Sequence, residues 1–280
     1  ASGAASLGAR VALIESELMG GDCLNYGCVP SKSFLKGAHL AKEIRSAAKY
    51  GLEISEMDVN TAALMNRVRS VIEEIRPHDS KERYEGLGVT VMNGHGRLVD
   101  RNTVAISDPK GSNKRITAKK IVIATGSRAV VPAIPGLDTV EFLTNKSVFE
   151  LKDTPKHLIV LGGGPIGLEL GQGFRHLGSE VTIIDRGEGL FNKDEPEVGP
   201  LMQRVLEDDG VKLMLGAKII RISRGDQQTD NNILVEIERG GVNYTITGDQ
   251  LLVSLGRTPN TENMGLKELG INLTDYGYIV

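Results

Sequence analysis

The segment that decides the fold class is Leu158-Ile159-Val160-Leu161-Gly162-Gly163-Gly164-Pro165-Ile166-Gly167, in a chain of 280 residues. Four apolar residues predict a buried strand, and the next six match G-x-G-x-x-G at the start of a helix. Asp185 lies 23 residues after Gly162, at the predicted tip of the next strand. In such a unit glycines permit a tight turn and close pyrophosphate approach, the helix N-terminus binds the phosphates, and the carboxylate bonds a ribose. The candidate dinucleotide-binding residues are Gly162, Gly164, Pro165, Ile166, Gly167 and Asp185.

The residue that ends this second strand also bears on which nucleotide is bound. Asp185 favours NAD, because a carboxylate accepts hydrogen bonds from the ribose hydroxyls and repels a phosphate at the same place. The neighbouring Arg186 leaves NADP open as the alternative, so we count it among the candidate cofactor-binding residues.

An internal repeat organises the rest of the chain. Leu177-Gly178 is followed by two residues, four strand-type residues and Asp185, and Leu7-Gly8 is followed in the same spacing by Glu15. Glu15 is therefore the candidate ribose ligand of a first dinucleotide site, with a surface acid at a strand end as the alternative. The equivalent of Gly162 would fall about eight residues before Ala1, so we expect a fragment whose first glycine motif has been removed.

Composition describes an ordinary globular chain, with 40% apolar residues and a net charge of −3. Its length favours two domains. The charge balance lacks the basic surface of a nucleic-acid-binding protein, and the longest apolar runs are far too short to span a bilayer. We therefore expect neither nucleic acid nor membrane as a partner.

The only two cysteines lie close together, in Gly20-Gly21-Asp22-Cys23-Leu24-Asn25-Tyr26-Gly27-Cys28-Val29-Pro30-Ser31-Lys32. A metal site normally needs more ligands, and one bridge over so short a loop adds little stability. The helix predicted from Val29 favours a thiolate nearby, so a redox-active pair suits the setting best. A structural pair and a metal clip remain the alternatives. So few cysteines suggest a reducing, cytoplasmic compartment.

This stretch resembles the active-site signature of the class I pyridine nucleotide–disulfide oxidoreductases, FAD flavoproteins that include mercuric reductase, dihydrolipoamide dehydrogenase and glutathione reductase. The Gly-Gly-Asp-Cys start and Pro77-His78-Asp79-Ser80 favour the mercuric reductase-like branch. The resemblance implies that Cys23 attacks the substrate disulfide or receives a metal ion, and that Cys28 lies against the flavin. It also implies that Lys32 stands near the reactive flavin nitrogen and pairs with Glu169. A solvated helix lysine is the alternative for Lys32.

Other landmarks of the family follow in order along the chain. Ala124-Thr125-Gly126-Ser127 resembles the element that passes beside FAD, and Gly96 matches a backbone contact to its adenine end. Gly256, in the Gly-Arg-x-Pro-Asn exit, would lie near the nicotinamide. The FAD-binding residues implied in this way are Gly21, Asp22, Lys32, Gly96, Ala124, Thr125, Gly126 and Ser127, together with Glu15 from the repeat.

Periodicity predicts the remaining elements. Helices are expected over residues 33–48 and, after an N-cap at Asn60, over residues 61–75 before Pro77. Adjacent residues cannot converge as a catalytic triad, so His78-Asp79-Ser80 is interpreted as a cap or turn. Alternation predicts strands over residues 88–91, 97–99, 103–106, 116–123, 233–237 and 244–247.

The expected fold is α/β: two tandem Rossmann-like dinucleotide-binding domains with three-layer architecture and small antiparallel β-meanders. We predict an FAD-binding domain at residues 1–148, an NAD(P)-binding domain at 149–256, and the start of the return to the FAD domain at 257–280. The resemblance places a C-terminal dimerisation domain, with its catalytic histidine, outside the chain. A homodimer is expected for the full-length protein, and weak or absent turnover for this fragment.

The predicted function is transfer of electrons from NAD(P)H through FAD to the Cys23–Cys28 pair and on to a small-molecule substrate. Mercuric ion, lipoamide and glutathione compete as that substrate. The alternative of another class is a non-catalytic nucleotide-binding protein with an inert cysteine pair.

Overall fold

A computed structural model describes residues 1–54, 57–108, 111, 113–225 and 232–280. The chain forms two compact units from discontinuous segments: a first of Ala1–Cys28, Val71–Arg128 and Arg257–Val280, and a second of Val29–Ser70 and Ala129–Gly256. These units group residues by contact, whereas the predicted domains divide the chain by cofactor. The domain boundaries at 148/149 and 256/257 therefore stay a prediction.

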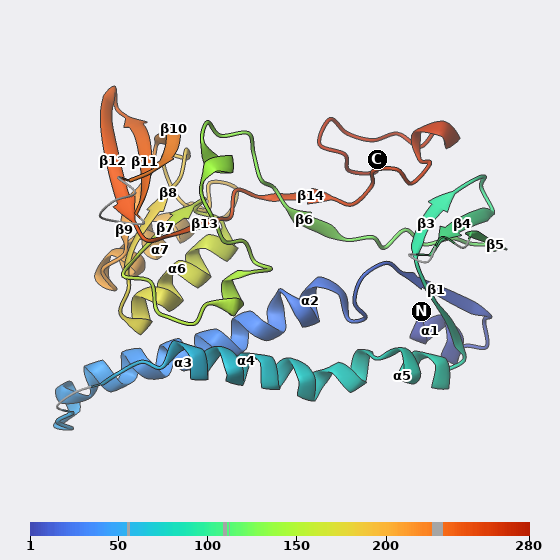
Figure 1. The fold of residues 1–280 in the computed structure, drawn as a ribbon, viewed down its shortest axis with the longest axis horizontal. Coiled ribbons are helices and arrows are strands. Elements are labelled where there is room, and N and C mark those ends of the chain that lie inside the picture. The colour runs from blue at the N-terminus through green and yellow to red at the C-terminus, as the bar shows by residue number, and fades with distance from the viewer. Residues whose placement is uncertain (55–56, 109–110, 112, 226–231) are drawn as a thin grey trace. The chain divides into compact units, whose positions relative to one another are not determined.

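A four-stranded parallel sheet forms the centre of the second unit, in the order β13-β7-β8-β9 (Figure 1). Its strands are β7 (His157–Leu161), β8 (Glu180–Ile184), β9 (Lys212–Met214) and β13 (Gln250–Val253). Helix α6 (Pro165–Leu177) is the crossover from β7 to β8, as the glycine motif predicts. Leu158, Ile159, Val160 and Leu161 are all fully buried, which explains why this strand is a continuous apolar run.

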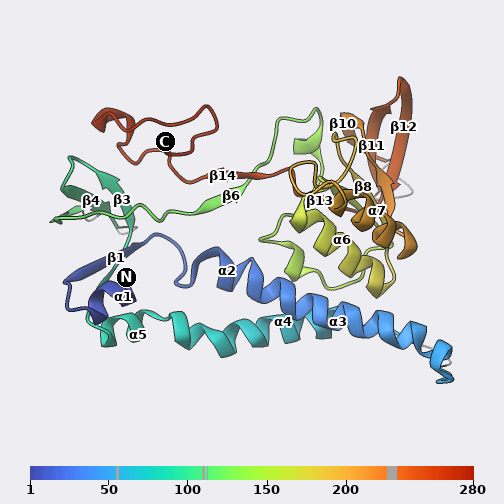
Figure 2. The ribbon, with the colours of Figure 1, turned by 180° about the vertical axis from the view of Figure 1, so that it is seen from behind.

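Two layers cover this sheet. On one face lies an antiparallel meander of β10 (Ala217–Arg224), β11 (Ile233–Arg239) and β12 (Val242–Gly248), and Ile159 and Ile184 share a hydrophobic cluster with Val235 and Ile237. On the other face lies α6, close enough that a Cβ on Gly171 would be 3.1 Å from Ile183 Cδ1. Figures 1 and 2 show the sheet between the meander and α6. The predicted α/β class and three-layer architecture are confirmed.

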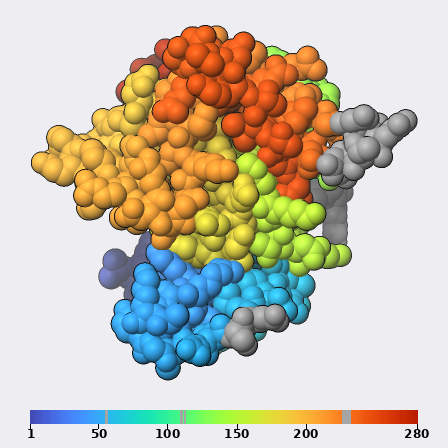
Figure 3. Space-filling view, turned by 90° about the vertical axis from the view of Figure 1, so that its left-hand side faces the viewer, coloured from blue at the N-terminus to red at the C-terminus, as the bar shows by residue number. Residues whose placement is uncertain are grey.

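A pair of helices packs on the outer side of α6 within the second unit. Helix α3 (Cys28–Ser46) and α4 (Thr61–Ile75) lie side by side, and a Cβ on Gly37 would be only 2.5 Å from Leu64 Cδ1. The rings of Phe34 and Phe174 are 4.8 Å apart, so α3 is joined to α6 through buried aromatic side chains. Figure 3 shows this helix pair, in blue and cyan, against the yellow surface of α6. Both predicted helices are confirmed, and Asn60 caps α4 by accepting a hydrogen bond from Ala63 N (2.9 Å).

One carboxylate, Asp209, connects three segments of the second unit. Its oxygens accept hydrogen bonds from Lys42 Nζ of α3 (2.5 Å) and from Gln172 Nε2 (2.7 Å) and His176 Nε2 (2.8 Å) of α6. Burial acts to raise the pKa of Asp209, but the hydrogen bonds from Lys42, His176 and Gln172 outweigh it and hold that pKa below its usual range. Asp209 follows α7 (Val198–Asp208), so this network fixes α3, α6 and the end of α7 to one another.

The first unit combines a parallel strand pair with a small antiparallel sheet. Strand β1 (Val11–Glu15) pairs with β2 (Val89–Asn93), and β3 (His95–Leu98), β4 (Thr103–Ser107) and β5 (Asn113–Thr117) form a meander. Leu98, Val104 and Ile106 pack there with Met264 and Leu266. The remaining elements of the chain are α1 (Ser2–Ser6), α2 (Gly21–Asn25), α5 (Lys81–Gly86), β6 (Ser127–Ala129), β14 (Arg257–Pro259) and short 3-10 turns at Ala47–Tyr50, Arg76–Asp79, Leu137–Thr139, Val148–Glu150 and Lys267–Leu269.

The internal repeat predicted from the sequence is present in the backbone. Helix α1 ends before Gly8 (φ +85°) and α6 ends before Gly178 (φ +114°). Each glycine leads into a strand, with Glu15 as the last residue of β1 and Asp185 directly after β8. Both glycines occupy the left-handed region, where a residue with a side chain would be strained. Ser80 likewise acts as the predicted cap, since its side chain accepts a hydrogen bond from Arg83 N at the start of α5.

The single strand predicted over residues 116–123 is wrong. Strand β5 ends at Thr117, and residues 121–126 lie outside any strand. Ile121 and Ile123 pack against the hydrophobic cluster of the first unit, whereas Val122 is 86% exposed. Alternating burial is therefore satisfied, but ladder hydrogen bonds also need a neighbouring strand, which alternation in the sequence cannot supply.

The histidine of the Asp209 network predicts how stability depends on pH. Burial lowers the pKa of His176 below its usual 6.5, although the hydrogen bond to Asp209 opposes this shift. The unfolded chain therefore takes up a proton more readily, and the free energy of unfolding should fall as pH falls below about 6.5, by at most about 1.4 kcal/mol per pH unit for this one group. Urea unfolding between pH 5 and 8 measures this loss.

The variant His176→Gln should remove that component, and the exposed His78→Gln is the matched control that should leave the slope unchanged. His157, whose pKa is also lowered by burial, contributes with the same sign in all three proteins. Equal slopes in the wild type and His176→Gln would contradict this account.

Candidate functional site

The loop that carries the cysteines is held in one shape by buried polar contacts. A Cβ on Gly20 (φ +85°) would lie 2.4 Å from Leu24 Cδ2, so glycine is required at the start of α2. The buried Asn25 donates hydrogen bonds to Met19 O (3.1 Å) and Gly21 O (2.8 Å), and accepts one from Arg76 Nη1 (3.2 Å). Asn25 and Arg76 were not among the predicted residues. The position of Asn25 between the two cysteines was the available signal, whereas nothing near Arg76 indicated this role.

Cys23 and Cys28 are both exposed. Cys23 lies in the middle of α2, and Cys28 is the first residue of α3, as the predicted helix start requires. Lys32 follows one turn later on the same helix and is exposed. Cys28 therefore lies at the N-terminal end of a helix of 19 residues, where the helix dipole is positive.

A second set of predicted residues is brought together by the segment that begins at Arg257. Arg257 Nη2 donates to Asp22 Oδ2 (2.9 Å) and to Ser127 O (2.6 Å), and its Nε donates to Ser127 Oγ (2.8 Å). Asn260 binds the same turn, since its side chain donates to Thr125 O (3.0 Å) and its backbone N–H to Gly126 O (3.0 Å). Three segments of the first unit that lie far apart in the sequence therefore meet. The sequence reasoning missed Arg257 and Asn260, although both lie in the quoted Gly-Arg-x-Pro-Asn pattern.

In the second unit, the three motif glycines have three different surroundings. A Cβ on Gly162 (φ +107°) would lie 2.4 Å from Ser254 O, and one on Gly167 would lie 2.1 Å from Gly162 O. Gly164, the N-cap of α6, has no atom within 4 Å of the position a Cβ would take. The first and third glycines therefore make the tight turn and the close helix–strand packing, and the second leaves open space at a helix N-terminus.

The two strand-end carboxylates are held in the same way. Glu15 Oε1 accepts a hydrogen bond from Glu17 N (2.8 Å), and Asp185 Oδ1 accepts one from Gly187 N (2.7 Å). In both cases the donor is the residue two positions later. Asp185 Oδ2 also accepts a hydrogen bond from Gly163 N (2.6 Å), so this carboxylate lies against the glycine loop.

The other candidate residues have plainer surroundings. Glu169 is exposed on α6, and the ion pair predicted between it and Lys32 is not among those formed in the described parts of the chain, so their pairing stays a prediction. Gly96 has ordinary contacts with Ile14. Gly256 (φ +115°) has open space at its Cβ position, and its carbonyl accepts a hydrogen bond from Val130 N (3.0 Å). The others are exposed or half-buried: Ala124, Pro165, Ile166 and Arg186.

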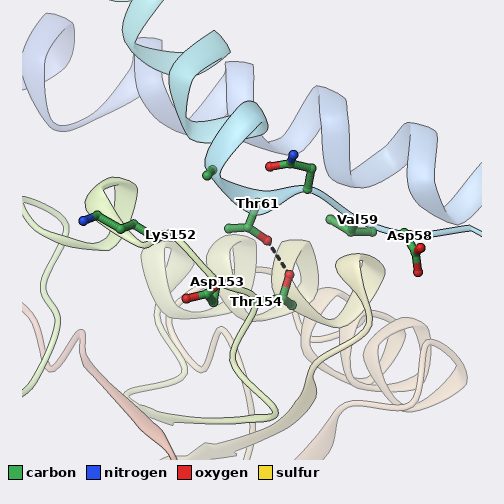
Figure 4. A pocket seen from close by; sticks show the side chains of 8 residues that line it. Asp58, Val59, Thr61, Lys152, Asp153 and Thr154 are labelled. Carbon is green, nitrogen blue, oxygen red and sulfur yellow. Dashed lines mark hydrogen bonds between the residues drawn. The ribbon is translucent and has the colours of Figure 1, made fainter.

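A cavity of about 340 Å³ lies at the N-terminus of α4 in the second unit (Figure 4). It is lined by Asp58, Val59, Asn60, Thr61, Ala62, Lys152, Asp153 and Thr154. The hydroxyl groups of Thr61 and Thr154 are hydrogen-bonded to each other, so this contact holds the start of α4 against the segment before β7. None of the predicted site residues lines the cavity.

The comparison with protein families decides the assignment, because a model of the pyridine nucleotide-disulphide oxidoreductases matches residues 1–280. The chain belongs to this family.

Individual members of the family cover nearly all of the chain. Mercuric reductase from Bacillus cereus is 36% identical over 277 residues, which are 99% of this chain and 42% of that protein. Mitochondrial dihydrolipoyl dehydrogenase from Sus scrofa is 36% identical over 293 residues, 99% of this chain and 55% of that protein. The chain thus spans about half the length of the curated relatives it matches.

Solved structures give the same result. The HOCl-induced flavoprotein disulfide reductase RclA from Escherichia coli superposes with a TM-score of 0.81 at 27% identity, and the match covers 100% of this chain and 58% of that one. Its Cu(II) complex superposes with a TM-score of 0.82 at 28% identity.

Among the described residues, no helix has the length and apolar character needed to cross a lipid bilayer.

Members of the pyridine nucleotide-disulphide oxidoreductase family use FAD and NAD(P)H. The second unit fits a nicotinamide dinucleotide: open space at Gly164, a helix N-terminus and a strand-end carboxylate are the three parts of such a site. The first unit fits part of FAD, because Glu15 ends its strand like Asp185, and Gly126 (φ +68°) is exposed with open space at its Cβ position.

The contrast between two glycines predicts separate effects on binding and on folding. In Gly164→Ala the added methyl group meets no protein atom but occupies the space for a pyrophosphate, so NADH affinity should fall at least about tenfold with stability unchanged. Gly167→Ala, the matched comparison, should instead lower the free energy of unfolding by about 1–3 kcal/mol, because its methyl group would overlap Gly162 O. Calorimetric NADH titration and urea unfolding measure the two effects, and unchanged NADH affinity in folded Gly164→Ala would refute the assignment of this loop.

Proposed function

We propose that this chain is the nucleotide- and disulfide-bearing part of an NAD(P)H-dependent flavoprotein disulfide oxidoreductase, and that electrons leave it through Cys23 and Cys28. The observation that carries the proposal is the exposure of the only two cysteines of the chain, Cys23 in the hydrogen-bonded α2 and Cys28 at the start of α3. Family membership supports the same reaction class.

Each group of residues has a distinct task in this reaction. The glycine loop at residues 162–167 binds the pyrophosphate of the nicotinamide nucleotide, and Asp185 accepts hydrogen bonds from its ribose hydroxyls. FAD, when bound, supplies the two-electron carrier between the nicotinamide and the cysteine pair. Lys32 provides a positive charge for the flavin and Glu169 supports that charge.

Chemistry at the sulfur atoms completes the reaction. When Cys23 and Cys28 are both reduced, the Cys23 thiolate attacks a substrate disulfide or binds a metal ion. For a disulfide, the Cys23 sulfur forms a mixed disulfide as the first substrate thiol leaves, and the Cys28 sulfur then attacks Cys23, closing the Cys23–Cys28 bond and releasing the second substrate thiol. For a metal ion, closing the Cys23–Cys28 bond passes two electrons to the ion, and the two thiol protons go to solvent. The N-terminal end of α3 stabilises negative charge on the Cys28 sulfur during this exchange.

A soft metal ion is the substrate that we favour, because thiolates prefer such ions and a mercuric reductase is among the similar proteins. The Cu(II) complex recorded for RclA is a second case of a family member with a metal ion. Lipoamide is the second candidate, since a dihydrolipoyl dehydrogenase is equally similar, and a glutathione disulfide is the third. We further propose a cytoplasmic homodimer that binds neither nucleic acid nor membrane.

The redox proposal is tested on the full-length protein. We expect anaerobic NADH to expose two additional thiols, and Cys23→Ser or Cys28→Ser to abolish NADH-dependent reduction of mercuric ion, lipoamide and glutathione disulfide while NADH still binds. Comparison of the three substrates identifies the one reduced fastest. A cysteine pair that neither opens nor closes with NADH would instead favour a non-catalytic nucleotide-binding protein.

Nucleotide preference is tested at Asp185. NADH should be preferred to NADPH, and Asp185→Ala should narrow that preference at least about tenfold, because hydrogen bonds to a charged group contribute about 1.5–3 kcal/mol. Arg186→Ala is the matched neighbour and should weaken NADPH use without loss of NADH use. A wild type that uses NADPH many-fold better than NADH would overturn the role given to Asp185.

A further inference from the structure

Arg257 joins the cysteine loop to the 125–128 turn through one ion pair and two further hydrogen bonds. Its guanidinium group is 2.9 Å from the Asp22 carboxylate and donates two further hydrogen bonds to Ser127, one to the hydroxyl and one to the carbonyl oxygen. Arg257 and Asp22 are both only partly exposed, and both lie in the first unit. Asp22 is the residue immediately before Cys23, so one end of this contact is attached to the reactive loop.

The charges of Asp22 and Arg257 have opposite effects on the Cys23 thiolate. A carboxylate next to Cys23 disfavours the thiolate, which is the reactive form of the side chain. The positive charge on Arg257 cancels that of Asp22, and its bonds to Ser127 hold the guanidinium in place independently of Asp22. Arg257 therefore offsets the charge of Asp22, the residue before Cys23, while fixing the loop to the 125–128 turn.

We propose that Arg257 is a positioning residue for Cys23: it neutralises and anchors the Asp22 carboxylate and so keeps Cys23 reactive at neutral pH. This inference rests on the proposed function only for the role of Cys23 in the reaction. The reactivity of the Cys23 thiol measures it directly, without turnover.

The test is the rate of alkylation of Cys23 by iodoacetamide as a function of pH, in the full-length protein. A Cys28→Ser background leaves Cys23 as the one thiol of its tryptic peptide, and mass spectrometry follows that peptide. As a general scale, one unit charge removed at a separation of about 6 Å in a medium of effective dielectric constant about 40–80 shifts a thiol titration by roughly 0.5–1 pH unit. Arg257→Gln should therefore move the midpoint of the pH–rate profile upward by about that amount.

Asp22 supplies the second arm of the test. Asp22→Asn removes the negative charge but leaves Arg257 bound to Ser127, so the midpoint should move downward by a similar amount. The double variant restores neutrality and should return the midpoint to the value of the Cys28→Ser parent. Should Arg257→Gln fail to fold, as judged by circular dichroism, the downward shift in Asp22→Asn still tests the charge argument.

Arg128 offers a matched control in the same unit. Its guanidinium binds Glu262 through two hydrogen bonds of 2.9 Å and Asn260 at 3.0 Å, so Arg128→Gln breaks a comparable ion pair on the neighbouring strand without contact with Asp22. The midpoint in Arg128→Gln should not move.

Shifts of the same sign in Arg257→Gln and Asp22→Asn, or equal shifts in Arg257→Gln and Arg128→Gln, would overturn the proposal. Loss of NADH-dependent turnover has a separate meaning. If the wild type shows none, the proposed function fails, while the alkylation profiles still decide the role of Arg257.

Discussion

The close approach of Gly167 to Gly162 is the constraint on which the second unit depends. A Cβ on Gly167 would lie 2.1 Å from Gly162 O, so α6 can begin directly against the end of β7 only because no side chain intervenes. Two further glycines allow close packing on the other faces of the same helix. Gly171 lies against Ile183 of the sheet, and a Cβ on Gly173 would be 2.4 Å from the Phe34 ring of α3. One helix can therefore begin at an open glycine loop, cover a sheet and pack against a second layer of helices.

The strand-end carboxylates show how a repeat in sequence becomes a repeat in hydrogen bonding. Glu15 and Asp185 each accept the amide of the residue two positions later, which fixes the side chain at the tip of its strand. Asp185 has an additional bond from Gly163 N, so its position depends on the glycine loop as well as on its own turn. In the nucleotide-binding role that we propose for Asp185, a carboxylate held by its own turn and by the glycine loop is pre-organised, which reduces the ordering needed when nucleotide binds.

Ionic contacts in the first unit join segments that sequence order keeps apart. Arg257 connects the cysteine loop to the 125–128 turn, and Arg128 connects that turn to Asn260 and Glu262. These contacts are partly exposed, so their contribution to stability is modest. Their effect is on geometry and charge, because they determine which groups surround Asp22 and the Cys23 thiol.

Local patterns predicted the parts of this protein that depend on neighbours in the chain. The apolar run at residues 158–161, the glycine motif, the N-caps at Asn60 and Ser80 and the helix that begins near Cys28 all follow from spacing and backbone sterics. The cysteine pair and the Leu-Gly repeats were visible in the same way. The strand predicted over residues 116–123 was wrong because a strand needs a neighbouring strand to pair with, and alternation in the sequence does not provide one.

Only the tertiary structure decided which distant side chains meet. Asn25 with Arg76, Asp22 with Arg257, and Asp209 with Lys42 and His176 are pairs whose members are separated by many residues. Each side chain, taken alone, is an ordinary surface charge or amide in the sequence. The sequence by itself determined the two dinucleotide-type strand–carboxylate units and the exposed cysteine pair, because those depend on local backbone geometry. The charges around Cys23 and the union of α3 with α6 were settled by folding, since hydrogen bonds and ion pairs depend on distance in space.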